Sequence, residues 1–321
     1  MENLIGHNQQ REALRRQFEH KQLPHALLFS GPSGIGKSLV ARELAITLLS
    51  TETSAAQIEN ATDKGNHPDF FFIDCQDTEQ ASTEEVRKLL HSLHLKSYAG
   101  PNRVVILNNV HYLNAQALNA LLKSLEEPRP GTYFILVTSH PNNLLKTILS
   151  RCQIWSFHSL SEEELQQVLE QKKDEFPSEH MAVLSFIADG SLENVFRLSN
   201  HIHEWQEMRR SLLQISLGDR VLAVELAKKL GKEKEQAIRS IHFMRILARQ
   251  KLKELDSPES ADKWARCLEH SLLAQNAVER RHINATYLFQ SIFLELAAPE
   301  YVPSSSQSPI EAALDSYTGR K

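Results

Sequence analysis

Cysteine is scarce in this chain of 321 residues, where only Cys75, Cys152 and Cys267 occur, far apart in the sequence. No two of them form a CxxC pair, so we expect neither a thiolate metal site nor a disulfide framework. Three buried or half-buried thiols are the expected outcome. Long apolar runs are also missing, because none approaches the roughly 20 residues that a membrane-spanning helix needs.

The sequence also lacks a secretory signal and a generally basic composition. Its first residues, MENLIGHNQQ, carry an acid and amides where a signal peptide needs a basic and then an apolar stretch. The 36 Lys and Arg against 40 Asp and Glu give a formal charge of −4, which argues against a protein that holds DNA through an overall basic coat. We therefore expect a cytoplasmic protein with no membrane contact.

The first half of the chain alternates between strand-like and helix-like segments. Apolar runs favour strands at 25–30, 67–75, 103–107 and 132–139, and helical spacing of apolar residues favours helices over 37–50, 82–95 and 115–127. Such alternation predicts a parallel sheet covered by helices on both faces. The polar segment 51–66 is expected to be a surface connection.

Strand signals disappear after residue 157. Helical segments at 161–173, 178–190 and 191–202 predict a small helical domain, and helical patterns continue from about residue 204. The expected fold class is therefore α/β plus all-α. We place the domains at 1–157, 158–203 and 204–302, followed by a disordered tail at 303–321 that is rich in serine and proline.

The segment GPSGIGKS, residues 31–38, matches the phosphate-loop pattern GxxxxGK[ST] between a predicted strand and a predicted helix. Its glycines let backbone N–H groups turn toward phosphates, Lys37 can reach the outer phosphates, and the Ser38 hydroxyl suits Mg²⁺. The residues expected to bind ATP are Gly31, Pro32, Ser33, Gly34, Ile35, Gly36, Lys37, Ser38 and, near the end of the strand 132–139, Thr138. The alternatives are a glycine-rich turn without a ligand and, for Thr138, an ordinary strand-end hydroxyl.

The acidic pair that follows a central strand in hydrolysing P-loop enzymes is missing. Asn108 and Asn109 occupy the place after the strand 103–107. An amide supplies no negative charge to Mg²⁺ and cannot accept a proton near neutral pH, so hydrolysis should slow by a factor of roughly 10²–10⁴. Asp74 and Asp77 are the other acids to consider if the strand is misaligned, although the segment 67–75 is a poor match for that position.

Several further motifs accompany the phosphate loop in one order. HPDF at 67–70, NALLKSLEEP at 119–128 and SRC at 150–152 join LIGHNQQREAL at 4–14 and LPHALLFS at 23–30. In combination they resemble the bacterial clamp-loader branch of the AAA+ ATPases, strongly from about residue 3 to 157 and in helical pattern to about 300. The resemblance implies a P-loop AAA+ domain, a small helical lid domain and a C-terminal helical collar that assembles a ring.

Within that branch, the resemblance separates ATP-hydrolysing motor subunits, which carry the acidic pair, from a stationary subunit that tolerates its loss. Motors also present an arginine to the nucleotide after a Gly-Ser pair, and Glu193 stands at that place here. The resemblance thus implies the stationary role, with ATP bound weakly or without hydrolysis and Mg²⁺ only alongside ATP. Many relatives place four zinc-binding cysteines in the region that is 51–66 here, which has none, so no zinc is expected.

Arg151, in the SRC motif, is the residue to which the resemblance gives a catalytic role. In a ring it would act in trans as an arginine finger on the ATP of a neighbouring subunit. The alternative is a salt bridge within the fold, to Glu126 or Glu127. The implied partners are the gamma/tau and delta subunits, the sliding clamp and primer-template DNA. Two competing interpretations are a hydrolysing gamma/tau-like motor and a nucleotide-binding protein without a role at DNA.

Overall fold

The chain divides into two units, Met1–Arg197 and Leu198–Lys321. In the computed structural model the described residues are 4–50, 54–76, 79–93, 97–172, 175–254, 258–281 and 284–298. The predicted tail at 303–321 lies outside them. The predicted domain boundaries after residues 157 and 203 stay predictions, because a two-unit division does not distinguish three domains.

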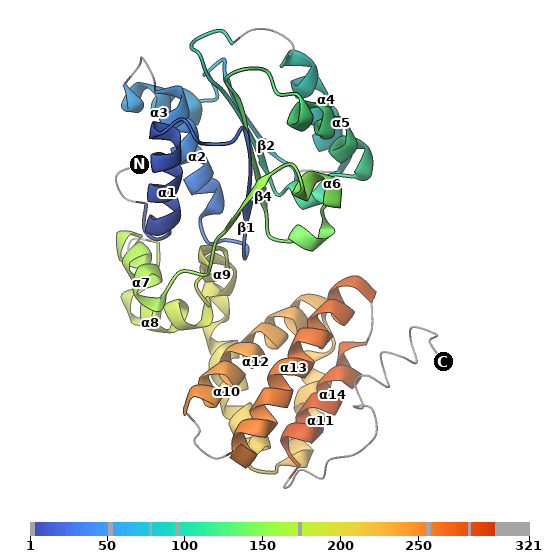
Figure 1. Cartoon of the computed structure of the whole chain (residues 1–321). Helices are drawn as coiled ribbons and strands as arrows, with labels where there is room; N and C mark the ends of the chain where they lie inside the picture. Colours follow the sequence, from blue (N-terminus) through green and yellow to red (C-terminus); the bar gives the residue numbers. More distant parts are fainter. Residues whose placement is uncertain are drawn as a thin grey trace. The chain divides into compact units, whose positions relative to one another are not determined.

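The described part of the first unit contains a five-stranded parallel sheet with the strand order β2-β3-β4-β1-β5 (Figure 1). Its strands are β1 (Ala26–Ser30), β2 (Phe70–Asp74), β3 (Arg103–Asn108), β4 (Thr132–Thr138) and β5 (Gln153–Ser156). The first four confirm the predicted strands, whose inner residues such as Leu28 and Leu136 are fully buried. β5 was not predicted, because its four residues are mostly exposed and form no apolar run.

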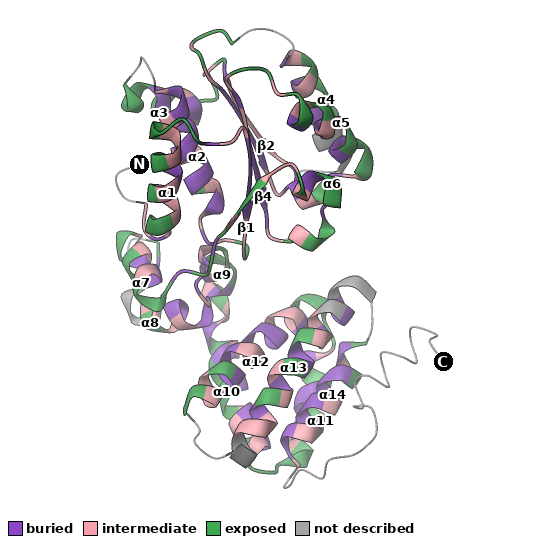
Figure 2. Cartoon of the chain, viewed as in Figure 1, coloured by how far each residue is buried: buried purple, intermediate pink, exposed green. Residues whose placement is uncertain are grey.

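Helices cover both faces of this sheet, as predicted (Figure 1). One face carries α1 (Asn8–Glu19), α2 (Lys37–Leu49) and α3 (Ala55–Asp63), and the other carries α4 (Glu79–Ser92), α5 (Ala115–Glu126) and α6 (Lys146–Leu149). Val40 and Leu44 pack with Ile106 on the first face, and Leu121 packs with Val105 on the second. Figure 2 shows the resulting buried strands between helices whose outer surfaces are exposed.

The helix α3 lies in the segment 51–66, where sequence analysis expected only a surface connection. Ile58 and Thr62, four residues apart, are buried on one side of this helix, at 5% and 6% exposure. The surrounding residues are small or polar, so the apolar signal was too weak to predict a helix. The other residues of the segment whose burial is described are exposed or half-buried, in agreement with a surface location.

A group of short helices follows the sheet in the first unit: α7 (Glu162–Gln171), α8 (Ser178–Ile187) and α9 (Leu192–Leu198). Ser161 and Glu164 form a capping box at the start of α7, in which each side chain accepts the backbone N–H of the other residue, at 3.1 and 2.9 Å. The Leu160 N–H donates to the Gly190 carbonyl at 3.1 Å. These bonds fix the turn that leads into α9, which approaches the phosphate loop.

The second unit is helical throughout its described residues. It contains the 3₁₀ turn η3 (Ser199–His201) and the helices α10 (Ile202–Ser216), α11 (Arg220–Leu230), α12 (Lys234–Glu254), α13 (Pro258–Arg281) and α14 (Ala285–Leu296). Two further 3₁₀ turns, η1 (Val110–Tyr112) and η2 (Pro141–Asn143), lie in the first unit. The fold class predicted from the sequence, an α/β domain followed by helices, is confirmed. None of the described helices is long and apolar enough to cross a membrane.

The aspartate of the HPDF motif holds one end of the sheet together. Asp69 and Arg103 are only 1% and 5% exposed. The Asp69 carboxylate accepts the backbone N–H groups of Tyr98 at 2.9 Å and Ala99 at 2.6 Å, and the Arg103 Nε–H at 3.4 Å. From the sequence this motif was only a sign of family resemblance. The structure gives it a role, because one buried carboxylate joins the start of β2 to the segment that enters β3.

Replacing Asp69 should therefore destabilise the fold strongly. We expect Asp69→Ala to lower the free energy of unfolding by about 3–5 kcal/mol, because the buried Arg103 loses its counter-charge. Adding Arg103→Met should give a double variant less destabilised than the sum of the single losses. Urea unfolding measures both effects. The control is Glu43→Ala, which breaks a pair with Arg11 whose side chains are 29% and 21% exposed, and an equal loss there would contradict the prediction.

Candidate nucleotide site

The phosphate loop joins the end of β1 at Ser30 to the start of α2 at Lys37. Gly34 and Gly36 have φ angles of +71° and +97°, in the left-handed region that glycine adopts most easily. Gly36 is also the N-cap of α2 and contributes no capping side chain. The first N–H groups of this helix therefore face the loop, where the helix N-terminus favours an anion. This is the geometry predicted from GPSGIGKS.

Lys37 turns back onto its own loop. Its Nζ donates to the Gly31 carbonyl at 2.8 Å and also to the Pro32 carbonyl. Burial lowers the pKa of Lys37 to about 8, and the nearby Glu193 carboxylate acts in the opposite direction. The ammonium group is thus held by the carbonyls of the loop itself.

The N-terminus of α9 packs directly on the loop, and we call the residues Ser191, Leu192 and Glu193 the lid contact. The Leu192 N–H donates to the Gly34 carbonyl at 2.8 Å, and the Ser191 hydroxyl donates to the Ser33 carbonyl at 2.9 Å. The Ser33 hydroxyl in turn donates to the Glu193 carboxylate at 2.5 Å. The residue that stands in place of the expected arginine therefore brings a negative charge to the phosphate loop.

Asn108 and Asn109 lie at the end of β3, and their amide nitrogens donate to a single carboxylate. The distances from Asp74 are 2.7 Å for Asn108 Nδ2 and 3.1 Å for Asn109 Nδ2. Asp74 ends β2 and pairs in register with Asn108. Sequence analysis considered Asp74 only as an alternative acid. The structure places it beside the amide pair, so the two positions that normally carry acids are occupied with holding a neighbouring aspartate.

Thr138 ends β4 next to the loop and contacts a residue that sequence analysis did not single out. Gly31 N–H donates to the Thr138 carbonyl at 3.3 Å, and the Thr138 hydroxyl lies 3.1 Å from His111 Nδ1 in η1. The ring centroids of His111 and His140 are 4.8 Å apart. Burial, His140 and Lys37 together lower the pKa of His111 to about 4. His111 and His140 come two or three residues after the ends of different strands, so their spacing along the chain gave no signal that they meet.

Arg151 lies just after α6 and pairs with Glu126, the last residue of α5. Its Nη1 also donates to the Thr147 carbonyl at 2.9 Å and to the Ser150 hydroxyl at 3.2 Å. The side chain keeps 32% of its surface exposed. The salt bridge to Glu126, one of the alternatives considered from the sequence, is therefore present in the isolated chain. An exposed pair of this kind is weak, so it can be exchanged for a stronger anionic partner.

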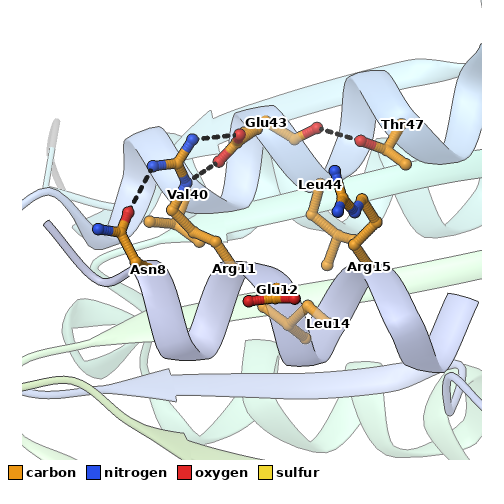
Figure 3. A pocket seen from close by; sticks show the side chains of 9 residues that line it. All are labelled: Asn8, Arg11, Glu12, Leu14, Arg15, Val40, Glu43, Leu44 and Thr47. Atoms are coloured by element: carbon orange, nitrogen blue, oxygen red, sulfur yellow. Dashed lines mark hydrogen bonds and ion pairs between the residues drawn. The ribbon is translucent and has the colours of Figure 1, made fainter. Parts of the chain in front are cut away.

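A separate hollow of about 260 Å³ lies between α1 and α2 (Figure 3). The Arg11 guanidinium crosses it to make two hydrogen bonds of 2.6 Å with the Glu43 carboxylate. The lining residues are Asn8, Arg11, Glu12, Leu14, Arg15, Val40, Glu43, Leu44 and Thr47. None of them belongs to the loop 31–38, so this hollow is distinct from the phosphate site.

The donor set around the loop fits a phosphate better than it fits a divalent cation. The Ser38 hydroxyl is the expected Mg²⁺ ligand, but the carboxylates that would accompany it are replaced by the amides bound to Asp74. Among the described residues, no group of three or more His, Cys, Asp and Glu side chains could hold a metal ion. Zinc is held by thiolates, imidazoles and carboxylates, whereas magnesium is usually held by one or two carboxylates together with substrate phosphates and water.

The lid contact makes a steric prediction at Gly34. A Cβ atom there would lie 2.3 Å from the Glu193 Cβ and 2.4 Å from the Ser191 Oγ. We expect Gly34→Ala to lower the free energy of unfolding by about 1–3 kcal/mol more than Gly65→Ala, because of this overpacking. Gly65 is the matched control, since its φ of +66° is similar and no atom lies within 4 Å of its added Cβ. Equal losses in thermal or urea unfolding would contradict a tight lid contact.

Comparison with known proteins shows which family this chain resembles. Residues 6–161 match the family model described as DNA polymerase III, delta subunit. The DNA polymerase III subunit tau/gamma of Haemophilus influenzae is 33% identical over 208 residues, which are 62% of this chain and 30% of that protein. The subunit delta' of Bacillus subtilis is 30% identical over 63% of this chain and 61% of that protein, and the subunit delta' of Pseudomonas aeruginosa is 37% identical over 41% and 42%.

The chain thus spans between 30% and 61% of the length of these relatives. Among solved structures, a DNA polymerase III gamma subunit-related protein from Thermotoga maritima aligns with 90% of this chain and 98% of its own, at 16% identity and a TM-score of 0.42, too distant to support a conclusion. Relatives of both names, delta' and tau/gamma, match this chain at similar identity, between 30% and 37%. By the family match and these relatives, residues 6–161 are similar to the delta, delta' and tau/gamma subunits of DNA polymerase III.

Proposed function

We propose that this protein is the delta' subunit of a bacterial DNA polymerase III clamp loader. In this role it acts in the cytoplasm as the stationary member of an AAA+ ring and helps gamma/tau and delta subunits to load the sliding clamp onto primer-template DNA. The observation that carries the proposal is the pair Asn108–Asn109, held by Asp74 at the place of the catalytic acids. Without a base or an anionic metal ligand, this subunit is not expected to hydrolyse ATP.

The lid contact supports the same interpretation. Glu193 accepts a hydrogen bond from Ser33 and lies close enough to affect the charge of Lys37. A carboxylate beside the loop repels the terminal phosphate that an arginine at the same place would attract. ATP is therefore expected to bind weakly at Gly31–Ser38 and Thr138, with Mg²⁺ present only as a companion of the nucleotide.

Arg151 gives a subunit without its own hydrolysis a part in catalysis. A guanidinium is always charged and makes planar, forked hydrogen bonds with phosphate oxygens. In a ring of similar domains it would reach the ATP of the next subunit and stabilise charge on the transferred phosphoryl group, an effect worth roughly 10³–10⁵ in rate. In the isolated chain Glu126 holds the same group, and docking would exchange this carboxylate for phosphate.

The competing function is an ATP-hydrolysing motor like gamma or tau. Sequence similarity alone does not decide, since the tau/gamma relative of Haemophilus influenzae is 33% identical to this chain. The amide pair and Glu193 support the delta' proposal over the motor, because a motor needs acidic and basic groups at those places. The two functions differ in one measurable property, the turnover of ATP by the protein alone.

The isolated protein is expected to show no significant ATPase activity. Asn108 and Asn109 can neither activate water nor supply charge to Mg²⁺, so phosphate release should stay far below the roughly 1 s⁻¹ or faster typical of enzymes. A steady-state phosphate-release assay measures this, with Lys37→Ala as the control for contaminating ATPase. Turnover at a motor's rate that disappears in Lys37→Ala would overturn the delta' assignment in favour of the motor.

The trans role of Arg151 predicts a loss that appears only in the complete complex. Arg151→Ala should leave assembly and thermal stability nearly intact and lower DNA- and clamp-stimulated ATP hydrolysis by at least about tenfold, since a trans arginine can be worth 10³–10⁵ at one site. Arg151→Lys should restore little, because an ammonium cannot form the fork. The readouts are ATPase rate and clamp loading in a reconstituted complex.

Glu126→Ala is the matched control for this experiment. It breaks the same salt bridge but leaves the guanidinium in place. If Arg151 acts on a neighbour's phosphate, only the Arg151 variants lose activity. If the pair is only structural, both alanine variants should behave alike, and that result would remove the trans role.

Assembly is expected to depend on the second unit. The predicted boundary at 203/204 falls inside α10, which begins at Ile202, so a truncation after Leu198, the last residue of α9, is the cleaner test. This fragment should remain folded by circular dichroism but fail to co-elute with gamma/tau and delta subunits in size-exclusion chromatography. Helices with many buried apolar residues can also present area to neighbouring subunits. Normal incorporation of the fragment would rule out the collar role.

A further inference from the structure

A cluster of imidazoles and hydroxyls lies between the end of β4 and η1, the short turn that follows the amide pair. His111 Nδ1 is 3.1 Å from the Thr138 hydroxyl, and His111 Nε2 is 3.5 Å from the Ser139 hydroxyl. The Ser139 hydroxyl is 2.9 Å from His140 Nδ1, and the backbone N–H of His140 donates to the Thr138 hydroxyl at 3.0 Å. We call His111, Thr138, Ser139 and His140 the imidazole cluster.

The imidazole cluster adjoins the phosphate loop. Thr138 pairs in register with Ser30, the last residue of β1, and its carbonyl accepts the N–H of Gly31 at the start of the loop. Lys37 is close enough to His111 for its positive charge to disfavour a second one on the imidazole. Loop, lysine and imidazoles therefore surround the same end of the site, the end at which the outer phosphates of a nucleotide would lie.

We propose that this site binds the polyphosphate group of a nucleotide without a divalent cation, with His111 and His140 supplying the positive charge that Mg²⁺ supplies in a hydrolysing site. An imidazole takes up a proton when an anion arrives and then donates from both nitrogens. The amides of Asn108 and Asn109 cannot replace the carboxylates that hold a cation. The proposal deepens the delta' assignment, because a site without a metal binds phosphates but does not activate water.

The charges around His111 set the direction of the pH dependence. The titratable groups near His111 are Lys37 on α2, His140 after β4 and Tyr112 in η1. Two carboxylates lie further away, Asp74 behind the amide pair and Glu193 behind Lys37. Burial, His140 and Lys37 keep the pKa of His111 near 4, and a bound polyphosphate raises it. Between these two pKa values the complex holds more protons than the free protein, so affinity increases as pH falls, by at most about tenfold per pH unit for each proton.

Equilibrium binding of inorganic tripolyphosphate and of ATP to the full chain tests the proposal. Isothermal calorimetry is run in EDTA and in excess Mg²⁺, at pH 5.5, 6.5 and 7.5. We expect both ligands to bind in EDTA, more tightly at pH 5.5, with Mg²⁺ giving no increase in affinity. The comparison of the two ligands separates recognition of phosphate from recognition of the nucleoside.

His111→Asn is the decisive variant, because an amide at the position of Nδ1 can keep the hydrogen bond to Thr138. It should weaken tripolyphosphate binding about tenfold at pH 5.5 and little at pH 7.5, since one linked proton is worth up to tenfold per pH unit. The ionisation of the ligand cancels in this comparison with the unchanged protein. His158→Asn, at an exposed position after β5, is the matched control and should change nothing.

Three outcomes would overturn the proposal: no binding in EDTA at any pH, binding that tightens tenfold or more with Mg²⁺, or the same pH dependence in His111→Asn as in the unchanged protein. A purely structural His111 would show the third, together with a lower unfolding temperature. None of these results bears on the delta' assignment itself, which is tested by the ATPase rate of the isolated chain and by Arg151 in the complex.

Discussion

The hydrogen bond from the Leu192 N–H to the Gly34 carbonyl is the constraint on which the candidate site depends. It ties residues more than 150 positions apart and brings Ser191 and Glu193 against the loop with it. Only a residue without a side chain fits at Gly34, because the lid contact fills the space where a Cβ would stand. The loop is thereby shaped by protein groups on both sides, with the β1–β4 pair below it and α9 above it.

The same arrangement recurs across the first unit: side chains at the positions of catalytic groups form hydrogen bonds or ion pairs with other groups of the chain. Lys37 donates to loop carbonyls, the amide pair donates to Asp74, and Arg151 forms an ion pair with Glu126. These partners differ in strength. The half-exposed Arg151–Glu126 pair is the kind that solvent and a competing phosphate replace easily, whereas the buried Asp69–Arg103 pair is not.

The sequence predicted most of the sheet because its inner strands are buried on both faces and appear as continuous apolar runs. The same rule missed β5, whose residues are largely exposed, and α3, where one buried pair is hidden among small polar residues. The loop was predictable because its chemistry is local. The Asp74 contact and the imidazole cluster were not, because they join the ends of different strands, and a spacing along the chain does not show which side chains meet there. Glu193 was placed by family resemblance and not by any local pattern.

Asn109 has φ +55° and ψ +39°, a left-handed backbone conformation outside glycine. Asparagine and aspartate adopt it with least difficulty, whereas a longer acid such as glutamate gains no local hydrogen bond there and meets a steric penalty of roughly 1–2 kcal/mol. Restoring a glutamate at this place would therefore disturb the backbone as well as the contact with Asp74. The left-handed backbone at Asn109 therefore disfavours the second acid by itself, and one substitution does not restore it.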